Sequence, residues 1–173
     1  MTRLASIDPA AVAREVVGWA ADHLSILATS LSNHSDLALP DEWSSTDIGL
    51  AAYVLAHYAQ TGDAPTDAPV REHLKSVALL WTVAHPGSVV TPPWELRVPS
   101  LATSLDLVLT AVTGREAIAA GDDVSTSQLA ALAGITYESA RKQGMRRELD
   151  VHDGHVTAAE ARRWLRARGV PGI

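Results

Sequence analysis

The sequence predicts a mainly α-helical fold with one short β-hairpin near its C-terminal end. Three observations lead to this prediction. Apolar residues recur every three or four positions through most of the chain, which is the spacing of one helix face. Capping residues, glycines and prolines divide this pattern into segments, as helix starts and ends do. Finally, Asp153-Gly154 lies between short apolar stretches and favours a two-residue hairpin turn.

The first predicted helix covers residues 9–31. Asp8 is a suitable N-cap, and Pro9 fits the first helical position because its missing N–H is not needed there. The apolar face of this helix is formed by Val12, Val16, Ala20, Leu24, Leu27 and Leu31. Its length is roughly twice the mean for globular proteins. Such a helix either packs on its own domain or forms a dimer interface, and the sequence leaves both roles open.

Two further helices are predicted in the middle of the chain. Ser45 or Thr46 is expected to cap the first of them, since a side-chain oxygen there can accept a backbone N–H of the first turn. Gly62 is expected to end it, because glycine adopts the left-handed conformation that closes many helices. Asp67 is then expected to cap a helix at about residues 69–84.

Residues 87–99 contain three prolines. They favour an irregular connector, because proline lacks the backbone N–H that a helix interior needs. Within it, residues 89–90 are expected to be extended, and Trp94 is expected to pack the connector against the helices. Ser100 then caps another predicted helix, which either continues through residues 113–114 or breaks there before a last turn.

The pattern next indicates two helices joined by a tight turn. Ser125 and Gln128 have the spacing of a capping box, in which each side chain bonds the other residue's backbone N–H. Gly134 suits the left-handed residue that ends this short helix. Thr136 can cap a second helix, which the sequence places at residues 137–147.

A hairpin and a last helix follow. Residues 149–156 alternate apolar and polar side chains around Asp153-Gly154. Thr157 and Glu160 have the spacing of a second capping box. The buried face of the last helix is expected to be formed by Ala161, Trp164 and Leu165. Three helices with a hairpin before the third make a winged helix-turn-helix plan.

The pieces of this plan read LAALAGIT, YESARKQGMRR, LDVHDGHV and AAEARRWLRARG. In this order they resemble the DNA-binding module of the MerR/excisionase superfamily. In that superfamily a leucine–alanine–glycine–isoleucine–threonine corner leads into a recognition helix, then a short wing, then a helix with a Trp-Leu pair. The resemblance covers about residues 123–169. It implies a winged helix-turn-helix module of the kind found in mobile-element and regulatory proteins.

Charge is unevenly distributed along the 173 residues, whose net charge is −6. Residues 123–173 carry eight basic and six acidic side chains, whereas residues 1–122 carry six basic and fourteen acidic ones. Such asymmetry is typical of a recognition module joined to an acidic partner domain. We therefore predict two domains. Residues 1–121 form an acidic helical domain for dimerisation, partner binding or ligand binding, and residues 122–173 form the winged helix-turn-helix domain.

Several function classes lack the residues they need. The chain has no cysteine, which excludes disulfides, thiol catalysis and thiolate metal sites. It contains no G-x-S-x-G, no G-x-x-x-x-G-K-[ST] and no G-x-G-x-x-G motif. We therefore expect a protein that is not an enzyme and uses no cofactor and no metal. His152 and His155 flank the hairpin turn as a metal pair would, but a solvated hairpin tip is the preferred interpretation.

The location of the protein is predicted from two absent signals. The N-terminal sequence does not have the pattern of a signal peptide. No uncharged apolar run of about 18 or more residues occurs, so no membrane span is expected. The predicted location is the cytoplasm.

The basic residues give the functional prediction. Residues 137–147 are expected to be the recognition helix of a DNA-binding transcriptional regulator that binds double-stranded DNA as a homodimer. Its predicted DNA contacts are Ser139, Arg141, Lys142, Gln143, Arg146 and Arg147. Arginine pairs with guanine, glutamine with adenine, and lysine and serine can hold phosphates. The last helix adds four arginines that are either phosphate contacts or solvated surface: Arg162, Arg163, Arg166 and Arg168.

The alternative is a non-enzymatic adaptor whose winged-helix segment mediates a protein–protein interaction. Asp150 and Asp153 make the wing acidic, and the whole chain is acidic as well. Both features favour a protein partner, because DNA attracts basic surfaces.

Overall fold

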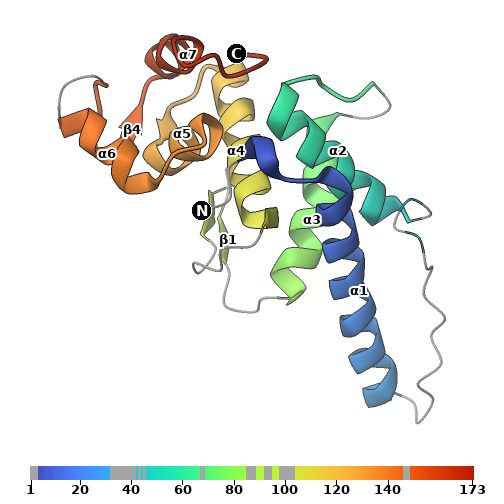
Figure 1. Ribbon diagram of the computed structural model, residues 1–173. Coiled ribbons are helices and arrows are strands. Elements are labelled where there is room, and N and C mark those ends of the chain that lie inside the picture. The colour runs from blue at the N-terminus through green and yellow to red at the C-terminus, as the bar shows by residue number, and fades with distance from the viewer. Residues whose placement is uncertain are drawn as a thin grey trace.

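The computed structural model describes residues 4–31, 42, 44, 46–66, 69–84, 89–91, 95–97, 104–145 and 149–173. Within these ranges the chain is mainly α-helical, as the sequence predicts (Figure 1). A short 3₁₀ helix, Leu4–Ser6, precedes seven α-helices: α1 Pro9–Leu31, α2 Asp47–Thr61, α3 Val70–Ala84, α4 Ser104–Ala120, α5 Thr126–Ala133, α6 Tyr137–Met145 and α7 Ala158–Arg166. Four short strands form two antiparallel pairs: β1 Val89–Thr91 with β2 Glu95–Arg97, and β3 Val124–Ser125 with β4 His155–Val156.

The long N-terminal helix has the predicted bounds of 9–31. Val12 and Val16 of its expected apolar face are fully buried, and α1 packs chiefly against α2. Leu24, Leu27 and Leu31 lie outside the residues whose side chains the structure describes. Figure 1 shows the C-terminal end of α1 extending away from the other helices.

The ends of α2 are those that the sequence predicts. Thr46 is the N-cap, and its hydroxyl oxygen accepts the N–H of Gly49 at 3.1 Å. Gly62 ends the helix with a φ of +81°, a left-handed conformation that suits glycine. The expected cap of α3, Asp67, lies outside the described residues.

The connector after α3 is more regular than predicted. Residues 89–90 are extended, as expected, but they belong to a strand that pairs with residues 95–97. The prediction missed the second strand because prolines weigh against strands, and here two prolines fall between the strands instead of inside them. Trp94 lies outside the described residues.

Helix α4 runs unbroken through Thr113-Gly114, which settles the choice that the sequence left open. Gly114 allows close packing on α5, because a Cβ there would lie 3.0 Å from Cβ of Gln128 and 3.1 Å from a methyl group of Leu132. Helix α4 also contacts α2 and α7, so it lies between the N-terminal helices and the C-terminal elements (Figure 1). Its expected cap, Ser100, is outside the described residues.

The predicted hairpin is correct at its turn and incomplete in its strands. Asp153 and Gly154 have φ values of +49° and +80°, which defines a type I′ turn. His152 and His155 exchange two backbone hydrogen bonds of 2.9 and 2.8 Å across it. Beyond that bridge, β4 pairs with β3, a strand before α5 that was not predicted from the sequence. Two residues are too short for a periodic pattern to identify.

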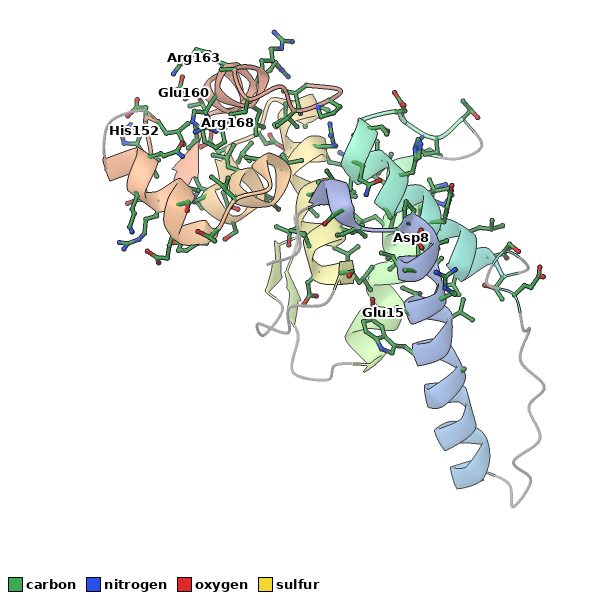
Figure 2. All side chains as sticks on the ribbon, in the orientation of Figure 1. Asp8, Glu15, His152, Glu160, Arg163 and Arg168 are labelled. Atoms are coloured by element: carbon green, nitrogen blue, oxygen red, sulfur yellow. The ribbon has the colours of Figure 1, made fainter. Side chains whose placement is uncertain are left out.

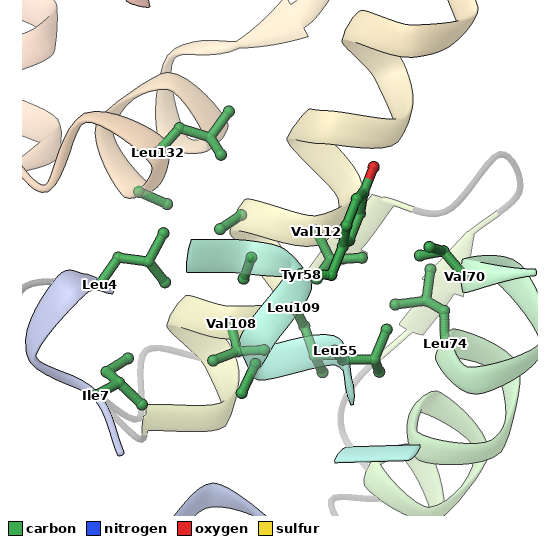
Figure 3. Packing of buried hydrophobic residues seen from close by; sticks show 14 of the residues in the cluster. Leu4, Ile7, Leu55, Tyr58, Val70, Leu74, Val108, Leu109, Val112 and Leu132 are labelled. Carbon is green, nitrogen blue, oxygen red and sulfur yellow. The ribbon is translucent and has the colours of Figure 1, made fainter. Parts of the chain in front are cut away.

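One cluster of buried apolar residues extends from the N-terminal helices into the C-terminal elements. It includes Leu4 of the 3₁₀ helix, Leu109 of α4 and Leu132 of α5 (Figure 3). Val156 of β4 and Trp164 of α7 belong to the same cluster. The core is therefore continuous across residues 121–122, where the sequence places the boundary between two domains. Among the described residues, none of the helices has the length and apolarity needed to cross a bilayer.

Candidate nucleic-acid interface

Helices α5 and α6 are joined by a short corner whose backbone groups are bonded locally. Ser125 and Gln128 form the predicted capping box at the start of α5. Gly134 ends α5 with a φ of +63°, and its N–H donates to the carbonyl groups of Ala130 and Ala131. Thr136 then accepts the N–H of Ser139 at 2.9 Å and so caps α6. These bonds satisfy backbone groups that the ends of α5 and α6 would otherwise leave free.

Helix α6 packs through small side chains. Ala140 is fully buried, and α6 lies against α5. A Cβ on Gly144 would lie 2.7 Å from a methyl group of Val151, just before the type I′ turn. The absence of a side chain at this position therefore sets how closely α6 approaches the wing, which we define as residues 149–156.

The structure separates the predicted DNA contacts into two groups. Ser139 and Lys142 are exposed and Gln143 is partly exposed. At about 100° per residue, these three side chains occupy an arc of roughly 100° around α6. Arg141 projects from the other side, where its guanidinium bonds the Glu138 carboxylate at 3.0 Å. Arg146 and Arg147 lie outside the described residues.

The arginines of the last helix have partners within the protein. Arg162 donates to the carbonyl of Ile118 at 2.7 Å, and Arg166 donates to the carbonyl of Ile173 at 2.9 Å. Arg163 forms an ion pair with Glu160 (Figure 2), and this hydrogen bond lowers the pKa of the Glu160 carboxyl. Within the described residues, the side chain of each of these three arginines is therefore bonded to a group of the same chain.

Arg168 contacts α6, a connection that was not predicted from the sequence. It follows the end of α7 (Figure 2), and its guanidinium carbon lies 4.0 Å from the centre of the Trp164 ring. One guanidinium nitrogen donates to Oε1 of Gln143 on α6. A pair 25 residues apart has no signature in the local pattern, so only the folded chain shows it.

The N-terminal cap of α7 follows the predicted capping box in part. Thr157 accepts the N–H of Glu160 at 3.4 Å, as the spacing predicts. The Glu160 carboxylate, however, is engaged by Arg163 and by the backbone of Asp150. The second half of the box is thus replaced by contacts to a neighbouring turn of α7 and to the wing.

The wing carries negative charge next to its histidines. Nε2 of His152 lies 3.1 Å from an Asp150 carboxylate oxygen, and both side chains are about 80% exposed. Nδ1 of His155 lies 3.1 Å from the backbone carbonyl of Asp153. Within the described residues, no group of three or more histidine, aspartate or glutamate side chains is arranged to hold a metal ion.

A buried arginine joins the C-terminal segment to the N-terminal helices. Arg115 on α4 is 3% exposed and donates to the carbonyls of Ala59 at 3.0 Å and Pro171 at 2.9 Å. Burial lowers the pKa of its guanidinium. The Arg115 guanidinium also lies over the ring of Tyr58, and burial together with the nearby Glu116 carboxylate raises the pKa of Tyr58 to about 12.

The role of Arg115 was not predicted from the sequence, although a signal was present. Leu105, Val108 and Val112 are buried at helical spacing, and the next position of that face is Arg115. A charged residue on an apolar helix face indicates a side chain that is buried with hydrogen-bond partners.

Comparison of the chain with protein-family models, with curated proteins and with solved structures finds no match in any of the three.

We expect Gly144→Ala to destabilise the protein. Alanine favours a helix over glycine by about 1 kcal/mol. Its Cβ, however, would overlap the stiff, β-branched Val151, and overpacking typically costs about 1–3 kcal/mol. The net loss should appear as a lower urea midpoint. Gly18→Ala is the matched control, because nothing lies within 4 Å of a Cβ there and the helix should become more stable. Equal stabilisation by both changes would show that α6 and the wing do not pack this closely.

Proposed function

We propose that residues 122–173 form a winged helix-turn-helix module of the MerR/excisionase type, and that it binds double-stranded DNA through α6 in a transcriptional regulator. One observation carries this proposal. Helix α6 follows a fully capped corner and packs through Ala140 and Gly144, while Ser139 and Lys142 remain exposed. An exposed helix face held by small residues can enter a major groove, which is about 12 Å wide.

The exposed side chains suit distinct tasks on DNA. Lys142 is a flexible point charge, so it fits a phosphate. Ser139 can donate to a phosphate or to a base edge. Arg141 is engaged with Glu138 at 3.0 Å, and it would have to leave this partner to reach DNA. Exposed helical ion pairs of this type are worth only about 0.3–0.5 kcal/mol, so that exchange costs little.

The remainder of the chain would bring a second copy of the module to the DNA, so that a dimer binds two half-sites. In helix-turn-helix regulators a dimer reads two half-sites, one helical turn of DNA or a multiple of it apart. Here residues 1–121 would dimerise, with the extended end of α1 (Figure 1) as a surface for it, or would bind a partner or a ligand. Such a regulator would work in the cytoplasm.

The second candidate function is a protein-binding adaptor. The acidic wing supports it, because Asp150 is about 80% exposed and would repel phosphates. Tyr137 at the start of α6 supports it too, since it is a large apolar residue with 49% of its surface exposed. Tyrosine is among the residues enriched in protein interfaces.

The DNA-binding proposal is tested by selecting a duplex from a random pool with the full chain, then measuring affinity by fluorescence anisotropy at several salt concentrations. Lys142→Ala is expected to weaken all duplexes evenly and to lower the salt slope by about one, because one phosphate contact is lost. Lys75→Ala is the matched control, since Lys75 is likewise an exposed helical lysine but lies on α3, where it pairs with Glu72.

The triple variant Arg141→Ala, Lys142→Ala, Arg146→Ala extends the test to the whole helix. If it stays folded and binds the selected duplex as well as wild type, α6 is not the recognition element. Failure of the wild-type chain to bind any duplex at low salt, together with capture of a protein partner, would favour the adaptor.

A further inference from the structure

Only one orientation of the Gln143 side-chain amide allows a hydrogen bond with the neighbouring Arg168. A guanidinium group carries five N–H donors and no acceptor. The atom of Gln143 that faces Arg168 must therefore be the carbonyl oxygen Oε1, at 2.5 Å from the arginine nitrogen. The amide nitrogen, with its two N–H donors, then points away from Arg168.

Arg168 is itself held in place. Its guanidinium stacks on Trp164, with 4.0 Å between the guanidinium carbon and the ring centre. Trp164 is 5% exposed and belongs to the core, so the surface on which Arg168 rests is rigid. A stacked guanidinium loses less conformational freedom on hydrogen bonding than a free side chain would. The contact of Arg168 with α6 is thus supported by a residue of the core, Trp164.

A fixed amide orientation changes which base Gln143 can read. An unrestrained glutamine recognises adenine with two bonds, accepting from N6 and donating to N7. Oε1 of Gln143 has two lone pairs and already accepts from Arg168 with one of them. The positive guanidinium beside it repels the partly positive N6 amino group of an adenine, so the second lone pair is a poor acceptor for that base. The two N–H donors of the Gln143 amide remain free to bond acceptor atoms on a base edge. Guanine is the base that presents two neighbouring acceptors, N7 and O6, in the major groove.

We infer that Arg168 is a positioning residue that makes Gln143 a hydrogen-bond donor, so that Gln143 selects guanine over adenine at one position of the DNA site. This inference rests on the proposed DNA-binding function and assigns a specificity determinant within it. Arg168 acts through Gln143 and does not need to touch the DNA itself.

The test uses the full chain and the selected duplex, with guanine and adenine exchanged at each position in turn. Wild type is expected to prefer guanine at one position by about tenfold, a typical discrimination for a good base contact. Gln143→Ala should abolish that preference alone. Arg168→Lys keeps the charge but loses the planar fork, so it should shift the preference at the same position toward adenine and leave the salt slope unchanged.

Two controls separate this role from a structural one. Arg14→Lys makes the same chemical change on α1, where Arg14 pairs with Asp8, and it should leave every base preference as in wild type. Gln143→Glu gives the side chain acceptors only, so it should also lose the guanine preference. If Arg168→Lys instead weakens all duplexes evenly and the guanine preference survives, Arg168 is not a positioning residue and the inference fails.

A readout without DNA distinguishes failure of this inference from failure of the proposed function. The side-chain amide NMR signals of Gln143 should shift in Arg168→Lys but not in Arg14→Lys, because the bond to Oε1 is lost. Wild-type protein that binds no duplex overturns the proposed function and the base preference with it. Protein that binds the duplex while neither the amide signals nor the preference respond to Arg168→Lys overturns the inference alone.

Discussion

Replacement of Trp164 by alanine is expected to destabilise the protein strongly, by more than Gly144→Ala does. The Trp164 side chain is 5% exposed, belongs to the continuous core and supports the guanidinium of Arg168. Truncation of a buried tryptophan typically costs about 3–5 kcal/mol. Total stabilities of single domains are about 5–15 kcal/mol, so a large share would be lost.

The measurement is urea unfolding followed by circular dichroism. Tyr137→Ala is the matched control, because Tyr137 is 49% exposed and its truncation should cost well under about 1 kcal/mol. An unchanged midpoint for Trp164→Ala would mean that the buried face of α7 has been placed incorrectly. Trp164 lies among the C-terminal elements, so we expect these to loosen first. The N-terminal helices should follow, because the same core extends into α4 and α2.

Arg115→Met is expected to have the second-largest effect. Methionine keeps most of the length of the side chain but removes all its donors. The carbonyls of Ala59 and Pro171 would lose their hydrogen bonds of 3.0 and 2.9 Å. An acceptor left unsatisfied in a buried position costs about 1–3 kcal/mol, and this applies to the buried Ala59 carbonyl. Pro171 is exposed, so its carbonyl can bond water instead, and we expect a total loss of roughly 1–3 kcal/mol.

The control for this change is Arg71→Met. Arg71 is 65% exposed and lies 3.8 Å from the Glu116 carboxylate, so its loss should cost at most about 1 kcal/mol. Hydrogen exchange gives a second readout, because the amides of residues 170, 172 and 173 should exchange faster in Arg115→Met than in Arg71→Met. Equal effects of the two substitutions would show that Arg115 does not hold the C-terminal segment.

The elements that the sequence predicted correctly are those whose signals are local. The capping box of Ser125 and Gln128 lies within one helical turn, and so does the left-handed Gly134 that ends α5. The type I′ turn depends on Asp153 and Gly154 alone. In each case neighbouring residues satisfy their own backbone groups, so the pattern can be read without knowing the rest of the fold.

The candidate site was predictable only in part, for the same reason. That Ser139 and Lys142 are exposed follows from the helical period around buried Ala140. The engagement of Arg141 with Glu138 also follows helical spacing, since the two residues are three positions apart. The period does not reveal that Gln143 is bonded by Arg168, because that contact needs α7 to be in place first.

The sequence by itself thus determined the start of α1, both ends of α2 and α5, the turn of the wing and the buried face of the last helix. The tertiary structure decided the pairing of β3 with β4, the continuation of α4 through Gly114, and the burial of Arg115 against the carbonyls of Ala59 and Pro171. Each of these depends on groups from segments far apart in the chain. Their hydrogen bonds and close approaches exist only after the core has brought those segments together, and no local pattern of residues specifies them.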